Sequence, residues 1–153
     1  MGKEGKMGRS DCATASALEI IGDRWSLLII RDFIFVGRRE YSDFMELREG
    51  ISTNILVNRL KWLIQVGIFT KHPHPTNKKK YYYKITNKGF DLIVVIMELA
   101  RWGWSHIPGA WSPAEVKSLF KKNQKTFIQE WKKRVKKSSK EYIKEANIGS
   151  NKG

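Results

Sequence analysis

Five side chains suited to reading DNA bases follow one another at helical spacing in the middle of the chain. They are Thr53, Asn54, Val57, Asn58 and Lys61, and they fall opposite a run of leucines. Asparagine can form paired hydrogen bonds with adenine, an apolar side chain can contact a thymine methyl group, and lysine can bind guanine or phosphate. These types favour a helix that enters the major groove, with an ordinary solvated helix face as the alternative.

Two basic clusters beside this segment are suited to phosphate groups. Lys78, Lys79 and Lys80 fall in a polar loop, and Arg38 and Arg39 precede a short helical pattern. Contacts from lysine and arginine to phosphate oxygens hold a protein in register on a duplex and make its affinity depend on salt. We expect phosphate contacts from all five residues, with a solvated loop as the alternative for the lysines and internal ion pairs for the arginines.

The other reactive side chains are one thiol and three imidazoles. Cys12 falls at the predicted start of a helix, after a predicted Asp11 cap. A helix N-terminus lowers the pKa of a thiol, although a lone cysteine is more often a small buried apolar residue. His72 and His74 have no carboxylate or cysteine at ligand spacing beside them, so we interpret them as exposed loop histidines and predict no metal site from these two or from His106. We also predict no cofactor and no enzyme, because neither a nucleophile–base pair nor a glycine-rich phosphate loop occurs.

The pattern around the base-reading residues predicts a helix-turn-helix. A short helix, Tyr41–Leu47, and a longer one, Ser52–Val66, enclose a turn, and Gly67 ends the second helix. We expect Ser52 to be the N-cap of the longer helix and to contact DNA as well. Two strand-like runs follow, Ile68–His72 and Lys80–Ile85, and predict a β-hairpin with lysines at its tip. Helix, turn, helix and hairpin together are the layout of a winged helix-turn-helix.

Helical patterns are also present on both sides of this unit. Apolar spacing predicts helices over residues 11–22 and 23–37, the second with Asp23 as its N-cap. After the hairpin, Thr86 can cap a further helix, whose apolar residues in Phe90–Trp102 cover more than one face. This excess implies burial against a second subunit, so we predict a homodimer.

Length and charge set the broad class. A chain of 153 residues with 41% hydrophobic side chains fits one globular domain with an appendage. Its net charge of +14 indicates a polyanionic partner, nucleic acid before anionic membrane. No apolar run could span a bilayer, so we expect a cytoplasmic protein without a membrane partner. We expect residues 1–10 to be a disordered N-terminal arm, 11–104 a winged helix-turn-helix DNA-binding and dimerisation domain, and 105–153 a basic C-terminal helical extension.

The extension carries much of the excess charge, since residues 105–153 contain 12 Lys and Arg against 4 Asp and Glu. Ser112 to Glu115 has the pattern of a capping box, and a basic amphipathic pattern follows it. Such a helix can lie on a membrane, hold the DNA backbone or pack on its own dimer, and we favour packing combined with backbone contact. The expected fold class is mainly α with a small β-hairpin wing, plus a C-terminal amphipathic helix.

An ordered series of residues between Asp11 and Trp104 resembles a known family. The chain is similar to the HxlR-type regulators, a branch of the MarR-like winged-helix group, at Cys12, Gly22, Trp25, Leu28, Ile29, Gly37–Tyr41, Phe44, Leu47, Gly50–Ser52, Leu56, Arg59, Leu60, Leu63, Gly67, Tyr83–Thr86, Gly89 and Trp102. The resemblance implies a homodimer on a palindromic operator, controlled by oxidants, electrophiles or aldehydes, with Cys12 where a sensing cysteine would stand. The lysine- and tyrosine-rich wing and the long tail depart from the family pattern.

Two classes of function remain open. The first is a homodimeric, sequence-specific transcriptional regulator of double-stranded DNA, responsive to oxidation through Cys12. The alternative is a basic architectural or RNA-binding winged-helix protein without sequence specificity. The two differ in their specificity ratio rather than in their affinity. The polar face of the Ser52–Val66 helix favours the first, and the lysine-rich extension keeps the second open.

Overall fold

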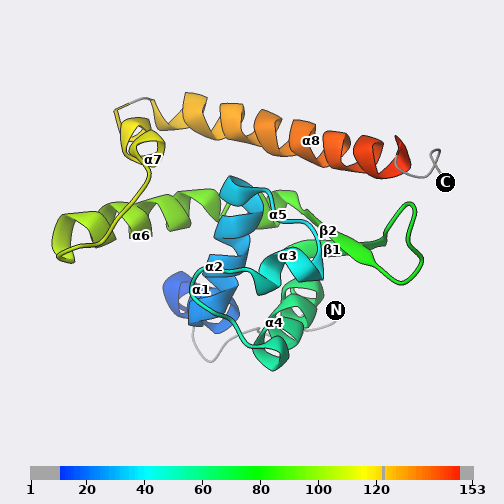
Figure 1. Ribbon diagram of the computed structural model, residues 1–153. Helices are drawn as coiled ribbons and strands as arrows, with labels where there is room; N and C mark the ends of the chain where they lie inside the picture. The colour runs from blue at the N-terminus through cyan, green and yellow to red at the C-terminus, as the bar shows by residue number, and fades with distance from the viewer. Residues whose placement is uncertain (1–10, 122, 149–153) are drawn as a thin grey trace, which may run out of the picture.

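A computed structural model describes residues 11–121 and 123–148 as a mainly helical chain with one two-stranded sheet (Figure 1). In chain order, the elements are α1 (Ala13–Ile21), α2 (Arg24–Arg31), the π-helical turn η1 (Asp32–Val36), α3 (Tyr41–Met45), α4 (Thr53–Gln65), β1 (Phe69–Pro73), β2 (Tyr81–Ile85), α5 (Asn87–Phe90), α6 (Ile93–His106), α7 (Ala114–Leu119) and α8 (Gln124–Ile148). The predicted fold class is confirmed. The predicted disordered arm, 1–10, lies outside the described residues.

Three helices begin at the side chains that the sequence predicts as caps. Asp23 accepts hydrogen bonds from two backbone N–H groups of α2, at 3.0 and 2.9 Å. Ser52 accepts one from α4 at 3.5 Å, and Thr86 accepts one from α5 at 3.1 Å. Each bond satisfies a donor that has no partner inside its helix. These three predictions are confirmed.

Two predicted helix starts are wrong. Cys12, rather than Asp11, is the N-cap of α1, because Cys12 is the last residue in an extended conformation (φ −72°, ψ 122°). The capping box expected from Ser112 is absent, because Pro113 is itself the N-cap of α7 and no side chain caps that helix. In addition, the long helix expected after the hairpin is interrupted, with α5 ending at Phe90 and α6 starting at Ile93.

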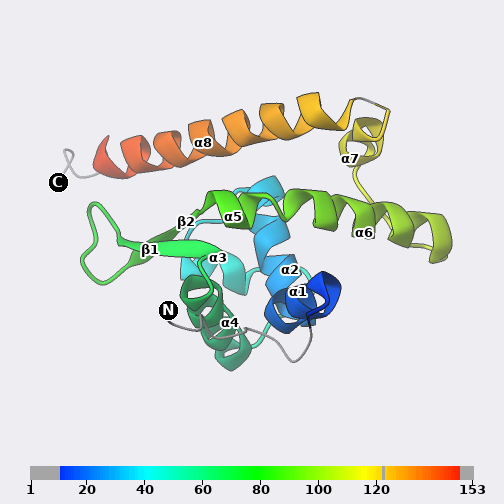
Figure 2. The same ribbon diagram turned by 180° about the vertical axis from the view of Figure 1, so that it is seen from behind.

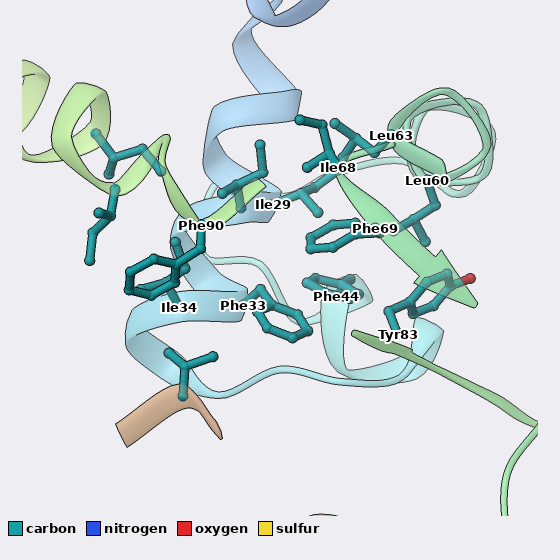
Figure 3. Close-up of a cluster of buried hydrophobic side chains, with 14 of the residues drawn as sticks. Ile29, Phe33, Ile34, Phe44, Leu60, Leu63, Ile68, Phe69, Tyr83 and Phe90 are labelled. Carbon is teal, nitrogen blue, oxygen red and sulfur yellow. The ribbon is translucent and has the colours of Figure 1, made fainter. Parts of the chain in front are cut away.

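The core lies where η1, α3, α4 and the hairpin meet (Figure 3). The Phe33 and Phe69 rings are 5.1 Å apart, and the Phe44 and Tyr83 rings are 6.1 Å apart. The predicted core face of α4 is confirmed, with exposed fractions of 2% or less for Leu56, Leu60 and Leu63. The buried face of α4 therefore anchors the helix, and its polar face is directed away from the core.

The hairpin is antiparallel and has two different faces. Lys71 pairs with Tyr83 and Pro73 with Tyr81, so these residues share one face. His72 pairs with Tyr82 on the opposite face, where their rings stack 5.3 Å apart. The first face is directed towards α4, and the second towards α8.

The basic extension folds back over the rest of the chain. The side chains of Phe127 and Val135 belong to the main hydrophobic cluster, with exposed fractions of 1% and 6%. Both views show α8 running along one side of the molecule and ending beside the hairpin loop (Figures 1 and 2). Within residues 11–121 and 123–148, no helix is long and apolar enough to cross a membrane.

Candidate nucleic-acid interface

The helix α4 presents the predicted base-reading face to solvent. Thr53, Asn54, Asn58 and Lys61 are exposed, and Val57 is half-buried. Ser52, the capping residue, is exposed as well. The leucines on the opposite side fix the rotation of the helix about its axis, so these polar groups are available to a partner.

The loop of the hairpin is held by its own polar groups. The Nδ1 atom of His74 accepts hydrogen bonds from the backbone N–H groups of Thr76 and Asn77, each at 3.2 Å. The side chain of Asn77 accepts one from the backbone N–H of Lys79 at 3.0 Å. Lys78 and Lys79 are therefore exposed on an ordered turn, and the histidine has a structural role in that turn.

A cleft of about 390 Å³ lies between α3, α4 and the hairpin and is strongly basic. Its lining includes Lys61 from α4 and Lys71, Lys79 and Lys80 from the hairpin. The Nζ atom of Lys80 is 3.0 Å from a carboxylate oxygen of Glu40, which compensates part of its charge. The cleft thus joins the helix face to the hairpin lysines in one positively charged surface.

Lys71 is a member of this cleft that the sequence interpretation missed. Its Nζ atom lies 4.0 Å from the centre of the Tyr81 ring, and both side chains are exposed. Strand alternation would have placed Lys71 on the α4 side of the hairpin, because it pairs with the buried Tyr83.

Arg38 is used inside the protein, which contradicts its predicted phosphate contact. Its Nε atom donates to the buried carboxylate of Asp32 at 2.8 Å, and its Nη atoms donate to the backbone carbonyls of Asp43 and Glu46. Only 16% of the side chain is exposed. A buried aspartate requires a partner, so Asp32 within an apolar run was the signal for this ion pair.

Arg39 is buried, with an exposed fraction of 2%, and its predicted phosphate contact is also wrong. Its guanidinium lies 3.9 Å from the centre of the Phe33 ring and donates to the carbonyl oxygens of Phe33 and Arg38. A third bond reaches the Oγ atom of Ser138 in α8 at 3.3 Å. Burial lowers the pKa of Arg39 to about 10. Because the side chain is buried and its hydrogen bonds are inside the chain, the residue serves packing rather than recognition.

Arg59, which the sequence left undecided, forms an ion pair inside the chain. Its Nη1 atom is 3.2 Å from Oδ2 of Asp23, the N-cap of α2. Partial burial acts to raise the pKa of Asp23, but hydrogen bonds from Ser26 and the charge of Arg59 outweigh it and lower that pKa. The pair ties α4 to the start of α2.

Cys12 is an exposed thiol at the start of α1. Hydrogen bonds from the backbone N–H groups of Ala15 and Thr14 lower the pKa of Cys12 from its ordinary value. The physical cause is the unpaired donors of a helix N-terminus, which stabilise a thiolate. The thiol is therefore accessible and more acidic than an isolated cysteine.

Comparisons with known proteins agree with this geometry. Residues 20–110 match the sequence model of the HxlR-like helix-turn-helix family. The chain belongs to the HxlR-like helix-turn-helix family. An uncharacterized HTH-type transcriptional regulator of Mycobacterium bovis, Mb3122, is 37% identical over 94 residues, which are 60% of this chain and 57% of that protein.

Two further relatives support the assignment to the HxlR-like family. The HTH-type transcriptional regulator YodB of Bacillus subtilis is 33% identical over 97 residues, which are 63% of this chain and 86% of YodB. The structure of reduced YodB superposes with a TM-score of 0.51 over 65% of this chain and 97% of its own. The crystal structure of PA1607 gives a TM-score of 0.60 at 30% identity, covering 69% and 70% of the two chains.

The HxlR-like match covers α4 and the wing, as the hairpin is called in this fold, but stops before α7. The relatives named here are described as HTH-type transcriptional regulators, and the chain spans little more than half the length of the Mycobacterium bovis relative. The helices α7 and α8 lie outside the part that defines the family.

Proposed function

We propose that this HxlR-type regulator binds a palindromic operator in double-stranded DNA as a homodimer. The observation that carries the proposal is the basic cleft between α4 and the wing, lined by Lys61, Lys71, Lys79 and Lys80. In this arrangement α4 enters the major groove and the wing lysines bind phosphates beside it. Two such units would contact half-sites about 34–36 Å apart.

Exposed apolar side chains support the homodimer. On α6, Val95, Leu99 and Trp102 have exposed fractions of 40%, 52% and 56%, and Leu18 on α1 has 59%. Large apolar groups gathered on helices mark a surface that associates with another protein surface. Sedimentation equilibrium at micromolar concentration is expected to give twice the chain mass, and Leu99→Glu is expected to give monomers. A monomeric wild-type protein would contradict the dimer.

The DNA proposal is tested with two duplexes of equal length, one from the region upstream of the protein's own gene and one scrambled. Binding is measured by fluorescence anisotropy at two salt concentrations. We expect a preference for the upstream duplex that persists at the higher salt, because base contacts do not depend on counterion release. Equal binding to both duplexes that collapses with salt would instead support the architectural or RNA-binding alternative.

We also propose that oxidation of Cys12 controls DNA binding. The support is its exposure and lowered pKa, together with the similarity to YodB, whose structure is described as a reduced form. A disulfide between the Cys12 thiols of two subunits would release two protons and transfer two electrons to an oxidant such as diamide. Diamide is expected to change the DNA affinity of the wild type and to leave Cys12→Ser unchanged; an equal response of both would exclude this switch.

A further inference from the structure

The helix α8 is held on the protein by one face, which fixes the direction of its other side chains. Phe127 and Val135 on this face are buried. One turn further on, the Oγ atom of Ser138 accepts a hydrogen bond from the buried Arg39 at 3.3 Å. Positions 127, 135 and 138 return to the same side of a helix, so the opposite side of α8 is directed away from the protein.

The outward face of α8 carries a lysine stripe, which we define as Lys133, Lys137, Lys140 and Lys144. All four side chains are exposed, and their spacing places them on one side of the helix. The whole helix holds eight basic and three acidic side chains. Like charges three or four residues apart repel each other, and among the described residues only Lys137 of the stripe has an ion pair, to Glu141 at 3.7 Å. Most of the positive charge of the stripe is therefore uncompensated within the chain.

The lysine stripe and the basic cleft lie on opposite sides of the molecule. The cleft is bounded by α4 and by the hairpin face that carries Lys71. The other hairpin face lies against α8, where the Tyr82 and Tyr142 rings are 5.5 Å apart, and the stripe is on the side of α8 opposite Tyr142. Figures 1 and 2 both show α8 along one side of the molecule and α4 on the other. The hairpin and the full width of α8, about 10–12 Å, thus separate the two basic surfaces.

The composition of the outward face indicates the class of partner. Within α8, Gln124–Ile148, the only exposed large apolar side chain is that of Ile148, the last residue. Protein–protein interfaces have an apolar core from which lysine is depleted, and helices that lie on membranes insert apolar side chains. The apolar side chains of α8 are instead used in its attachment to the protein. A row of lysines without apolar neighbours is suited to a row of phosphate groups.

We propose that the lysine stripe binds the phosphate backbone of a second DNA duplex, so that the protein bridges two DNA segments. A single short duplex cannot serve both basic surfaces, because they face opposite ways and DNA is stiff over about 150 base pairs. The stripe covers about 16 Å at 1.5 Å per helical residue, which matches roughly five phosphates of one strand at 3.4 Å each. This inference rests on the proposed DNA binding and adds a function to a helix outside the matched residues 20–110.

The test measures both basic surfaces of the full chain in one experiment. A short upstream duplex is immobilised on beads, and a fluorescent duplex of scrambled sequence is added with the protein. The amount of protein retained on the beads reports binding of the first duplex, and the retained fluorescence reports capture of the second.

Two double variants that lose the same charge are compared with the wild type. Lys140→Gln with Lys144→Gln removes half of the stripe. The control, Lys121→Gln with Lys125→Gln, changes exposed lysines that precede the stripe in the chain. Circular dichroism and urea unfolding first show that both variants fold.

Each lost phosphate contact lowers the slope of log affinity against log salt by about 0.9, so two lost contacts weaken binding of the second duplex roughly tenfold to a hundredfold near 0.1 M salt. We expect the stripe variant to lose capture of the fluorescent duplex by this factor, while as much of it as of the wild type stays on the beads. The control should capture the fluorescent duplex as the wild type does.

Three results would overturn the proposal: no capture by the wild type, undiminished capture by the stripe variant, or an equal loss in the control. Vesicles of anionic phospholipid complete the test, since stripe-dependent lipid binding without capture of the second duplex would assign the stripe to a membrane. Failure of the proposed function reads differently, as equal retention of the wild type on beads that carry upstream or scrambled DNA, whatever the capture of the second duplex.

Discussion

The burial of Phe127 predicts how firmly α8 is attached. Burying one large apolar side chain stabilises a folded protein by about 1.5–3 kcal/mol. Phe127 and Val135, both below 10% exposed, therefore contribute about 3–6 kcal/mol to the free energy that holds α8 on the rest of the chain. Truncating a buried phenylalanine to alanine costs about 3–5 kcal/mol. Phe127→Ala is therefore expected to release α8 while the rest of the chain stays folded.

Amide hydrogen exchange followed by mass spectrometry distinguishes this local release from global unfolding. A loss of 3 kcal/mol corresponds to about two orders of magnitude in the opening equilibrium, so peptides from α8 are expected to exchange at least a hundredfold faster in Phe127→Ala. Peptides from α4 and β1 should keep their protection. Gln129→Ala, at an exposed position of the same helix, is the matched control and should behave as the wild type.

Either of two results would refute this reasoning. If α8 in Phe127→Ala is as protected as in the wild type, Phe127 does not hold the helix. If α4 loses protection together with α8, the extension and the helix-turn-helix unfold as one unit, and no separate free energy can be assigned to the attachment of α8.

Four further substitutions test the local surroundings of Asp23, Gly89, Gly103 and Lys71. Asp23→Ala removes a cap and the Arg59 ion pair and should lower the free energy of unfolding by about 1–2 kcal/mol at pH 7. Because the folded pKa of Asp23 is lowered, this difference is present above the ordinary carboxyl pKa and should vanish in urea titrations as the pH falls through the lowered value. Gly89→Ala places a Cβ 2.5 Å from the backbone oxygen of Ile68 and should lower the free energy of unfolding by about 1–3 kcal/mol. Gly103→Ala, in helix α6 with open space around the new Cβ, should raise the free energy of unfolding by up to about 1 kcal/mol in the same urea titration. Lys71→Ala should reduce the salt slope of DNA binding by about 0.9 without changing the urea midpoint; an unchanged slope would remove Lys71 from the interface.

Local rules in the sequence were sufficient for the helix-turn-helix. The caps at Asp23, Ser52 and Thr86 and the leucine face of α4 each depend on residues within one or two turns. Gly67 ends α4 in the left-handed region, at φ 76°, as its lack of a side chain allows. For these features sequence distance and spatial distance are nearly the same, which is why spacing alone predicts them.

The basic residues were harder to assign, because burial depends on segments far apart in the chain. Arg39 looks like a surface residue in its local sequence, yet Ser138, 99 positions away, helps to enclose it. Lys71 was overlooked for the opposite reason, since a single lysine in a strand has no pattern until the register with Tyr83 is known. A charged residue in the sequence is a candidate for a surface contact, but tertiary packing decides whether its side chain is exposed to solvent.

The covering of the wing by α8 has a consequence for the kinetics of recognition. A two-stranded hairpin alone is only marginally stable in water, but here Tyr82 lies between His72 and Tyr142, with ring centres 5.3 and 5.5 Å away. These contacts restrict the wing already in the folded protein, so less conformational entropy remains to be lost when the wing contacts a partner. If the wing binds DNA as proposed, the complex of this pre-ordered wing is expected to dissociate slowly, and α8 would then influence the residence time as well as the affinity.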